Sequence, residues 1–459
     1  MIRLLPLKIP VRQISTNKGN CRVKSKPSYG PVILQNSTLS SGIKIAAART
    51  QGSSMGSCTI LFQAGSRYET SDDLGANHFL RIASSASGLA YTKFAKSHVL
   101  QQHGAALTCT SDRETIAYTL RCPVAYFPKL KGYLTDTAAR CCYHNWEIQD
   151  LRSVVNQSLI RMNPERRVLD LVQKACWGGP LSNSIFCDPE RLDSITGKSL
   201  VNFADQNFVA EKCTVGSVGI PFQTTMKIAE MIEGRRFNPK NPCGRRSFPR
   251  RGYEVEDLGP NSTTWIAVAV PGFGSCDFQS MVMSNIVAAA AGIGHMQMGM
   301  HDEDRVPSSP LGTMAGPDVN TSYKAFSISY LDTGVFGVLA KTRACSAWQV
   351  TLAAAEFLTN IGDLSLNQIE IGKQRLNLGL SLIDEDCVNL SESLALQALS
   401  NLKINDTFEA INMINACAAD TVSMVAKKIS LQSCNMALAV VGDIGRVPHD
   451  GEITRCRPC

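Results

Sequence analysis

The feature that most constrains the fold of this chain is an internal repeat. Three kinds of segment occur in the same order in both halves, the second copy lying 207 to 223 positions after the first. The paired segments are an apolar run at 57–65 and 264–272, two alternating runs joined by a polar turn at 106–122 and 326–339, and a second apolar run at 213–219 and 436–442. Three matches in one order indicate duplicated domains, whereas any one of them alone would be chance.

Helical and strand patterns mix within each half. The apolar spacing predicts helices over 73–87, 125–142, 146–162 and 346–361. The alternating runs predict β-hairpins between them. We therefore expect an α+β fold of two homologous domains, each a largely antiparallel sheet packed by helices.

A short segment in the middle of the chain separates the two copies. Residues 238–251 are rich in Pro, Gly and Arg and poor in apolar residues, which is typical of an interdomain linker. The expected domains are therefore residues 41–237 and 252–459. At 459 residues, with 44% hydrophobic and 19% charged residues, the chain is globular and too long for one ordinary core.

Two features of the composition bear on location. The longest apolar run, 286–294, is far shorter than the roughly 20 residues of a membrane-spanning helix. The 17 cysteines are an odd number without framework spacing. They favour reduced thiols over a secreted disulfide scaffold.

The positive charge is concentrated at the N-terminus. Residues 1–68 contain ten Lys or Arg and no acid, and the other residues carry 36 basic and 39 acidic side chains, a net charge of −3. With this slight negative charge, residues 69–459 lack the positive charge with which nucleic-acid-binding proteins contact phosphates. Residues 1–26 have the basic, hydroxylated composition of a mitochondrial transit peptide, and we predict a transit peptide and flexible leader over 1–40. The alternative is a disordered basic tail, which Pro6 and Pro10 favour because they interrupt a helix.

A motif follows the first apolar run. Residues 64–69 (Ala-Gly-Ser-Arg-Tyr-Glu) and 74–82 resemble the pitrilysin/insulinase-type metallopeptidases, in which a loop of this kind precedes a helix carrying His-x-x-Glu-His. Two histidines four positions apart share one helix face and bind zinc together. The glutamate beside them is the general base for the metal-bound water, and a carboxylate on a later helix is the third ligand.

In this chain the resemblance implies that the motif has lost its chemistry. His78 occupies the first ligand position, but Arg81 replaces the general base, Ile82 the second histidine and Ser158 the distal glutamate. Arginine has no acceptor for a proton and repels a divalent cation. No two of the seven histidines are four positions apart, so neither the motif nor its inverse occurs elsewhere. We therefore predict no catalytic residues, no metal ligands and no cofactor site, and we interpret His78 as a histidine held by hydrogen bonds.

Other patterns have ordinary interpretations. Residues 295–304 gather two histidines and three carboxylates, but without metal-ligand spacing they predict a polar loop. The glycine pairs at 272–274 and 292–294 lack the third glycine of a dinucleotide fingerprint and predict turns. Cys456 and Cys459 form a lone C-x-x-C, which predicts a flexible tail.

Among metal-free members of the family, the chain is similar to the core subunits of ubiquinol–cytochrome c reductase, respiratory complex III. The segments that carry this resemblance are 62–69, 78–85, 110–118 and 330–337. It implies a fold like that of mitochondrial processing peptidase and the LuxS metallohydrolases. It also implies a non-catalytic, peripheral subunit on the matrix side of the inner membrane. Its partners would be a second core subunit and cytochrome b in a homodimeric complex.

Two other functions remain open. The first is the non-catalytic α-type subunit of mitochondrial processing peptidase, which uses a glycine-rich loop to hold presequences. Residues 291–305 are short in glycine and end in acids, which disfavours it. The second is an active peptidase with an unfamiliar site. The cysteine content, linker and C-terminal tail also suggest the hypothesis of a diverged, tissue-restricted copy of the core subunit.

Overall fold

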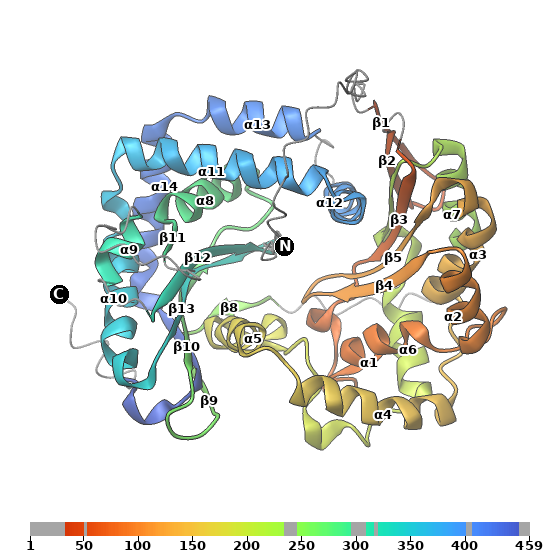
Figure 1. Ribbon diagram of the computed structural model, residues 1–459, viewed down its shortest axis with the longest axis horizontal. Coiled ribbons are helices and arrows are strands. Elements are labelled where there is room, and N and C mark those ends of the chain that lie inside the picture. The colour runs from red at the N-terminus through yellow and green to blue at the C-terminus, as the bar shows by residue number, and fades with distance from the viewer. Residues whose placement is uncertain are drawn as a thin grey trace, which may run out of the picture.

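The computed structural model describes residues 33–49, 53–233, 246–294, 309–315, 320–400 and 406–448. Two six-stranded sheets, one from each half of the chain, dominate the described structure (Figure 1). The first consists of β1 (Ile33–Thr38), β2 (Lys44–Arg49), β3 (Met55–Phe62), β4 (Ala106–Ser111), β5 (Ile116–Pro123) and β7 (Cys213–Val218). The second consists of β9 (Tyr253–Asp257), β10 (Thr264–Gly272), β11 (Ile293–Gly294), β12 (Ser322–Ser329), β13 (Gly334–Thr342) and β14 (Ala437–Gly442).

The strand orders confirm the internal repeat. The first sheet runs β1-β2-β7-β3-β5-β4 and the second β11-β12-β13-β10-β14-β9, so five strands correspond one to one. In each sheet the pairs are antiparallel except one, β2 with β7 and β9 with β14. The predicted α+β class with largely antiparallel sheets is therefore confirmed. A separate pair, β6 (Trp177–Gly178) and β8 (Phe248–Pro249), includes the described end of the expected linker, whose residues 238–245 lie outside the description.

Fourteen α-helices occur in the described residues. Those of the first half are α1 (Ala76–Ile82), α2 (Lys93–Gln102), α3 (Phe127–Ala139), α4 (Asn145–Ile160), α5 (Pro164–Cys176), α6 (Gly197–Asn207) and α7 (Phe222–Glu233). Those of the second half are α8 (Phe278–Ala291), α9 (Pro310–Ala315), α10 (Ala347–Thr359), α11 (Leu366–Asp384), α12 (Cys387–Leu399), α13 (Thr407–Ala416) and α14 (Ala419–Leu431). None of these helices is long and apolar enough to cross a bilayer.

Each half sends one helix to the other half's sheet. Helix α5 packs on β14, β10 and β9, and α12 packs on β7, β3 and β2, so both helices lie between the two sheets (Figure 1). The sequence-based division at 41–237 and 252–459 did not anticipate this exchange.

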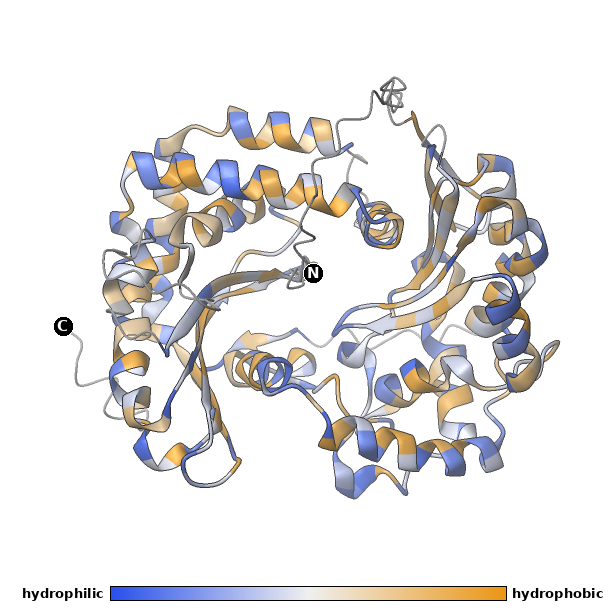
Figure 2. Cartoon of the chain, in the orientation of Figure 1, coloured by the Kyte–Doolittle hydropathy of each residue, from blue (hydrophilic) through white to orange (hydrophobic). Residues whose placement is uncertain are grey.

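The strand sequences explain how both faces of a sheet become buried. On β10, Ile266 and Val268 point into the core shared with the second half's own helices, while the alternating Ala267 and Ala269 face α5. On β2, Ala46 and Ala48 face α12 in the same way. Small side chains on one face let a helix approach closely, and the hydrophobic strands of Figure 2 reflect burial on both faces.

The first strand corrects one boundary. Ile33–Thr38 pairs along its whole length with β2, from Ile33 opposite Arg49 to Thr38 opposite Lys44. The leader predicted over 1–40 therefore extends too far, because residues 33–40 belong to the first sheet and its turn. The rest of the predicted leader, residues 1–32, lies outside the described residues.

Candidate functional site

Helix α1 carries the motif residues, and a buried carboxylate fixes its first turn. Glu69 accepts hydrogen bonds from the backbone N–H groups of Gly75, at 3.0 Å, and Asn77, at 2.7 Å. Gly75 has a φ of 94° and packs against Cys187, so a side chain there would be strained and would clash. Burial raises the pKa of Glu69 to about 8, although the two hydrogen bonds act in the opposite direction.

His78 is fully buried and both of its ring nitrogens are engaged. Nδ1 accepts the backbone N–H of Cys187 at 3.2 Å, so the hydrogen of the neutral ring lies on Nε2. Nε2 then donates to the Ser158 hydroxyl at 3.0 Å, and that hydroxyl donates to the Val155 carbonyl at 2.7 Å. The structure thus brings together His78 and Ser158, the residues at the first and distal ligand positions.

Two guanidinium groups lie beside this histidine. Arg81 and Arg166 lie 5.6 and 5.9 Å from the centre of the Phe186 ring, which itself meets the His78 ring in a T-shaped contact at 5.7 Å. Burial, with smaller contributions from these positive charges, lowers the pKa of His78 to about 3. The imidazole is therefore neutral at any physiological pH.

These residues do not fit the zinc ion that the family resemblance implies. A metal ligand must offer a lone pair, but one nitrogen of His78 accepts a backbone hydrogen and the other carries one. The neighbouring position offers the guanidinium of Arg81, and the distal position a hydroxyl. Within the described ranges, no group of three His, Cys, Asp or Glu side chains could hold a metal ion.

The other residues that the sequence singled out add no functional site among the described residues. Residues 295–304 and the tail at 456–459 lie outside the described residues. Gly272 is the last residue of β10 and Gly294 lies in β11, whereas Gly292, with a φ of 89°, ends α8, and a side chain at Gly274 would meet the backbone of Asp332 at 2.5 Å. Only one glycine of each pair therefore lies in a connection between elements.

Sequence reasoning missed a polar junction between the two halves. Arg67 binds Glu114 at 2.6 Å and also forms two bonds, of 2.7 and 2.6 Å, with the carboxylate of Asp332. Glu114 in turn accepts the backbone N–H of Leu331 at 2.9 Å. Glu114 and Asp332 lie at the turns of corresponding hairpins, β4–β5 and β12–β13, and Arg67 lies in the segment after β3, so the repeat brings its two copies into contact here.

A second, fully buried set of bonds lies behind the first. Arg113 donates to the Leu181 carbonyl at 3.0 Å, to Gln173 at 2.9 Å and to the Asp170 carboxylate at 2.8 Å. The Tyr330 hydroxyl donates to the same Gln173 oxygen. The junction is built largely from the segments that carry the family resemblance, 62–69, 110–118 and 330–337. The available signal was the charged run at 112–114 in the turn of the first hairpin and the single Asp332 in the turn of the second.

Comparison with known proteins finds a family model that matches part of the first half of the chain. Residues 44–189 match the model of the insulinase family, peptidase family M16, which confirms the resemblance drawn from the motif.

Individual relatives extend the match over nearly the whole chain. The human protein "cytochrome b-c1 complex subunit 2, mitochondrial" is 24% identical over 92% of this chain and 92% of its own length, and its Mus musculus counterpart is 23% identical over 94% and 96%. The "mitochondrial-processing peptidase subunit alpha" of Solanum tuberosum is 23% identical over 94% of this chain and 86% of its own length.

Proposed function

We propose that this chain is a non-catalytic subunit of mitochondrial ubiquinol–cytochrome c reductase, of the core protein 2 type. It supports assembly of the complex from the matrix side of the inner membrane, where it pairs with core protein 1 and docks under cytochrome b in the homodimeric complex. The observation that carries the proposal is the match to cytochrome b-c1 complex subunit 2 over 92% of both chains.

The geometry of the motif supports the absence of peptidase activity. A metal-bound water needs a base to remove its proton, and Arg81 stands where that base would be. His78 is neutral, buried and hydrogen-bonded at both nitrogens. We therefore propose that the chain binds no zinc and no other cofactor at this site. We also propose that residues 1–32 act as a cleaved transit peptide.

One relative favours a second function. The similarity to mitochondrial-processing peptidase subunit alpha also spans most of the chain, so an α-type, substrate-binding subunit of a processing peptidase is the alternative. In that case the chain would pair with an active, zinc-bearing partner instead of with core protein 1.

Blue-native electrophoresis of detergent-solubilised mitochondria separates the two functions. Migration of this chain together with cytochrome b and core protein 1 is the expected result. Migration at about 100 kDa with a zinc-bearing partner, twice the 49.7 kDa of one chain, would replace the proposal with the processing-peptidase function.

Metal analysis of the purified chain tests the inactive site separately. We expect far less than one zinc per chain, unchanged by His78→Asn. Stoichiometric zinc that this substitution removes would contradict the inactive assignment.

A further inference from the structure

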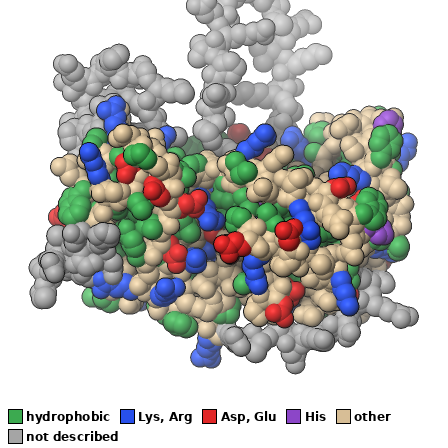
Figure 3. All heavy atoms as spheres, turned by 90° about the horizontal axis from the view of Figure 1, so that it is seen from below, with side chains coloured by type: hydrophobic (Ala, Val, Ile, Leu, Met, Phe, Trp, Pro, Cys, Tyr) green, Lys and Arg blue, Asp and Glu red, His purple; other side chains and the backbone are tan. Residues whose placement is uncertain are grey.

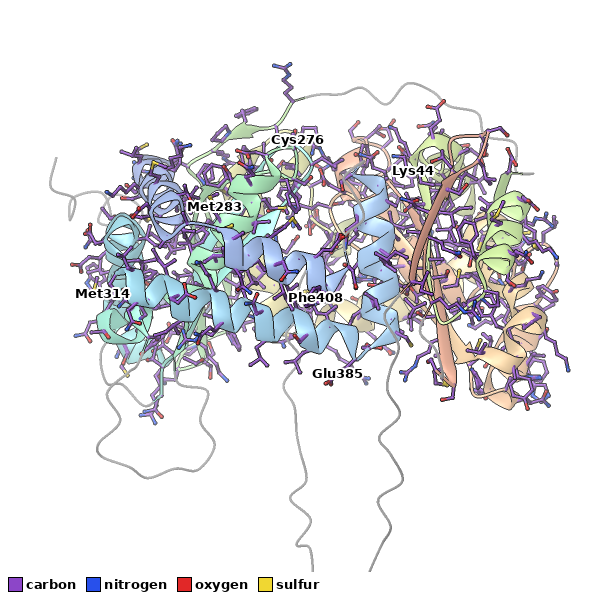
Figure 4. All side chains as sticks on the ribbon, turned by 90° about the horizontal axis from the view of Figure 1, so that it is seen from above. Lys44, Cys276, Met283, Met314, Glu385 and Phe408 are labelled. Atoms are coloured by element: carbon purple, nitrogen blue, oxygen red, sulfur yellow. The ribbon has the colours of Figure 1, made fainter. Side chains whose placement is uncertain are left out.

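Helices α2 and α3 lie side by side at one end of the molecule (Figure 1). The ring of Tyr91, just before α2, stacks on Tyr133 of α3 at 4.1 Å. His103, at the end of α2, meets the ring of Tyr126, just before α3, at 4.9 Å. The two helices are therefore antiparallel neighbours. Seen from above, they lie at the opposite end of the molecule from Met314 of α9, away from the contact between the two halves (Figure 4).

The outer side of these two helices exposes large apolar side chains. Leu89 in the loop before α2 is 73% exposed, Phe94 of α2 is 77% exposed and Tyr126 is 42% exposed. The inner sides of the helices, with Leu100 and Leu130, belong to the core of the first half. Figure 3 shows hydrophobic and histidine side chains together at this end of the molecule, at the right of the view. Exposed apolar side chains that gather on one surface mark a site of interaction.

Buried charged groups hold the loop that presents Leu89. The Asp136 carboxylate accepts the backbone N–H of Ala90 at 3.0 Å and lies 3.4 Å from the Lys96 ammonium. Lys96 donates to a backbone carbonyl just before the loop at 3.1 Å, and the backbone N–H of Leu89 donates to the Arg140 carbonyl at 2.9 Å. The side chains of Lys96 and Asp136 are only 4% and 2% exposed. The loop is thus fixed from within, which lowers the entropy cost of docking through Leu89.

The charge on this surface is positive. Residues 88–104 and 124–140 contain five Lys or Arg and one acid. The acid and one lysine form the buried pair described above, so the surface keeps four bases and no acid, namely Lys93, Lys129, Lys131 and Arg140. The adjoining helices α4 and α7 each carry two acids and one base. The positive charge therefore belongs to α2, α3 and the loop between Gly88 and Thr92.

We propose that this α2–α3 surface, made of Leu89, Lys93, Phe94, Tyr126, Lys129 and Arg140, docks on a membrane that contains anionic phospholipids. The bases attract the phosphate headgroups, and the apolar side chains enter the boundary between headgroups and acyl chains. A fluid bilayer needs no matching shape, so it suits side chains that protrude from the end of a molecule. A nucleic acid fits less well, because residues 69–459 carry a net charge of −3. The inference does not rest on the function proposed above.

The test is binding of the full chain to lipid vesicles, measured by co-sedimentation. One set of vesicles contains phosphatidylcholine alone, and the other contains one fifth phosphatidylglycerol. We expect binding to the anionic vesicles to be at least tenfold tighter, and to weaken as salt is added.

Apolar variants test the part of the surface that enters the bilayer. Leu89→Ser with Phe94→Ser is expected to weaken binding to the anionic vesicles about tenfold or more, because both side chains lose their apolar burial. The matched control is Leu378→Ser with Phe408→Ser, since these residues are 62% and 70% exposed on the distant α11 and α13. The control should bind like the wild type.

Charge variants test the attraction to the headgroups. Lys93→Gln with Lys129→Gln is expected to weaken binding to the anionic vesicles about tenfold. The matched control, Lys427→Gln with Lys428→Gln, removes two exposed lysines of α14 and should leave the binding unchanged.

A fluorescence measurement distinguishes this surface from the basic residues 1–26, which could bind the same vesicles. Phe94→Trp in the full chain adds a tryptophan at the proposed contact, and Phe408→Trp adds one at the control site. We expect brominated lipids in the anionic vesicles to quench the added fluorescence of Phe94→Trp and not that of Phe408→Trp.

Three results would overturn the proposal. The first is an added fluorescence in Phe94→Trp that brominated lipids do not quench. The second is vesicle binding that the α2–α3 variants leave unchanged, because residues 1–26 or another surface would then be the contact. The third is binding of a fluorescent single-stranded oligonucleotide, weakened by the same variants, without binding to vesicles, which would assign the surface to nucleic acid.

Discussion

Helix α5 leaves the first half to cover the second sheet, and α12 leaves the second half to cover the first, yet they are held in different ways. On α5, Arg167 pairs with Glu256 at 2.5 Å and Lys174 with Glu254 at 3.1 Å, and Asp170 binds the buried Arg113. Ion pairs and buried hydrogen bonds thus hold α5 in place, in addition to the packing of its apolar face.

Helix α12 is held instead by close approach and by hydroxyl groups. A methyl group on Gly216 of β7 would lie 2.2 Å from the Ser391 carbonyl oxygen, so the helix backbone lies directly on the strand. The hydroxyl of Thr59 contacts that of Ser391 at 2.8 Å, and the Thr214 hydroxyl donates to the Ala395 carbonyl at 3.0 Å. Equivalent positions of a duplicated fold can therefore keep one architecture while changing the interactions that stabilise it.

The largest expected loss of stability follows from breaking the buried ion pair between Arg113 and Asp170 of α5. Arg113→Met removes the positive charge and leaves the Asp170 carboxylate buried without its ionic partner. We expect a loss of about 3–5 kcal/mol in the free energy of unfolding. Urea denaturation measures it, with Arg121→Met, an exposed arginine on the same hairpin, as the control. A loss below 1 kcal/mol would mean that the buried ion pair contributes little to holding α5. Charged contacts would then not distinguish the attachment of α5 from that of α12.

For α12, the expected loss of stability follows from the short distance between its backbone and that of β7. Gly216→Ala forces α12 away from β7, and overpacking of this kind costs about 1–3 kcal/mol. Gly379→Ala is the matched control, because nothing lies within 4 Å of the added methyl on α11, and there we expect a gain of about 0.5–1 kcal/mol. Equal effects of the two substitutions would contradict the close approach of α12.

The repeat and the fold class were predictable from local sequence. The alternating runs at 106–122 and 326–339 became β4–β5 and β12–β13, and the apolar runs at 213–219 and 436–442 became β7 and β14. The exchange of α5 and α12 was not predictable, because periodicity identifies which face of a helix is apolar but not which sheet covers it. The alternating alanines of β2, β10 and β14 were a trace of a second covered face.

The candidate site was predictable in part. Motif spacing aligned His78 with Ser158, and the structure places them in contact. The partners Phe186 and Cys187 come from a segment more than 100 residues further along the chain, where no motif marks them. The junction of Arg67, Glu114 and Asp332 was missed for the same reason: its members lie on separate turns that only the tertiary fold brings together.

A smaller effect tests the hydroxyl contacts of α12. Thr59→Val keeps the shape of the side chain but removes its contacts with the Thr119 hydroxyl, at 2.9 Å, and the Ser391 hydroxyl. We expect a loss of about 0.5–1.5 kcal/mol, the net contribution of a hydrogen bond, because the Thr119 hydroxyl keeps its bond to Glu392 and the Ser391 hydroxyl its bond to the Val388 carbonyl. The control is Thr108→Val on the exposed side of β4, for which denaturation should show no change. A neutral Thr59→Val would mean that this hydroxyl contact adds nothing to the attachment of α12.

The smallest expected loss of stability is at the partly exposed ion pair between Arg67 and Asp332. The hydrogen bonds from Arg67 hold the pKa of Asp332 below its ordinary value. The ionised carboxylate therefore adds stability above the ordinary carboxyl pKa, and this stability is lost as the pH falls through the lowered value. Because Asp332 is 44% exposed, Asp332→Asn should cost only about 0.2–1 kcal/mol at pH 7, and the difference from the wild type should shrink towards zero as the pH falls through the lowered pKa. Asp193→Asn, in a pair whose carboxylate is 93% exposed, is the control and should change nothing. A loss at pH 7 as large as that of Arg113→Met would mean that the two layers of the junction act as one unit.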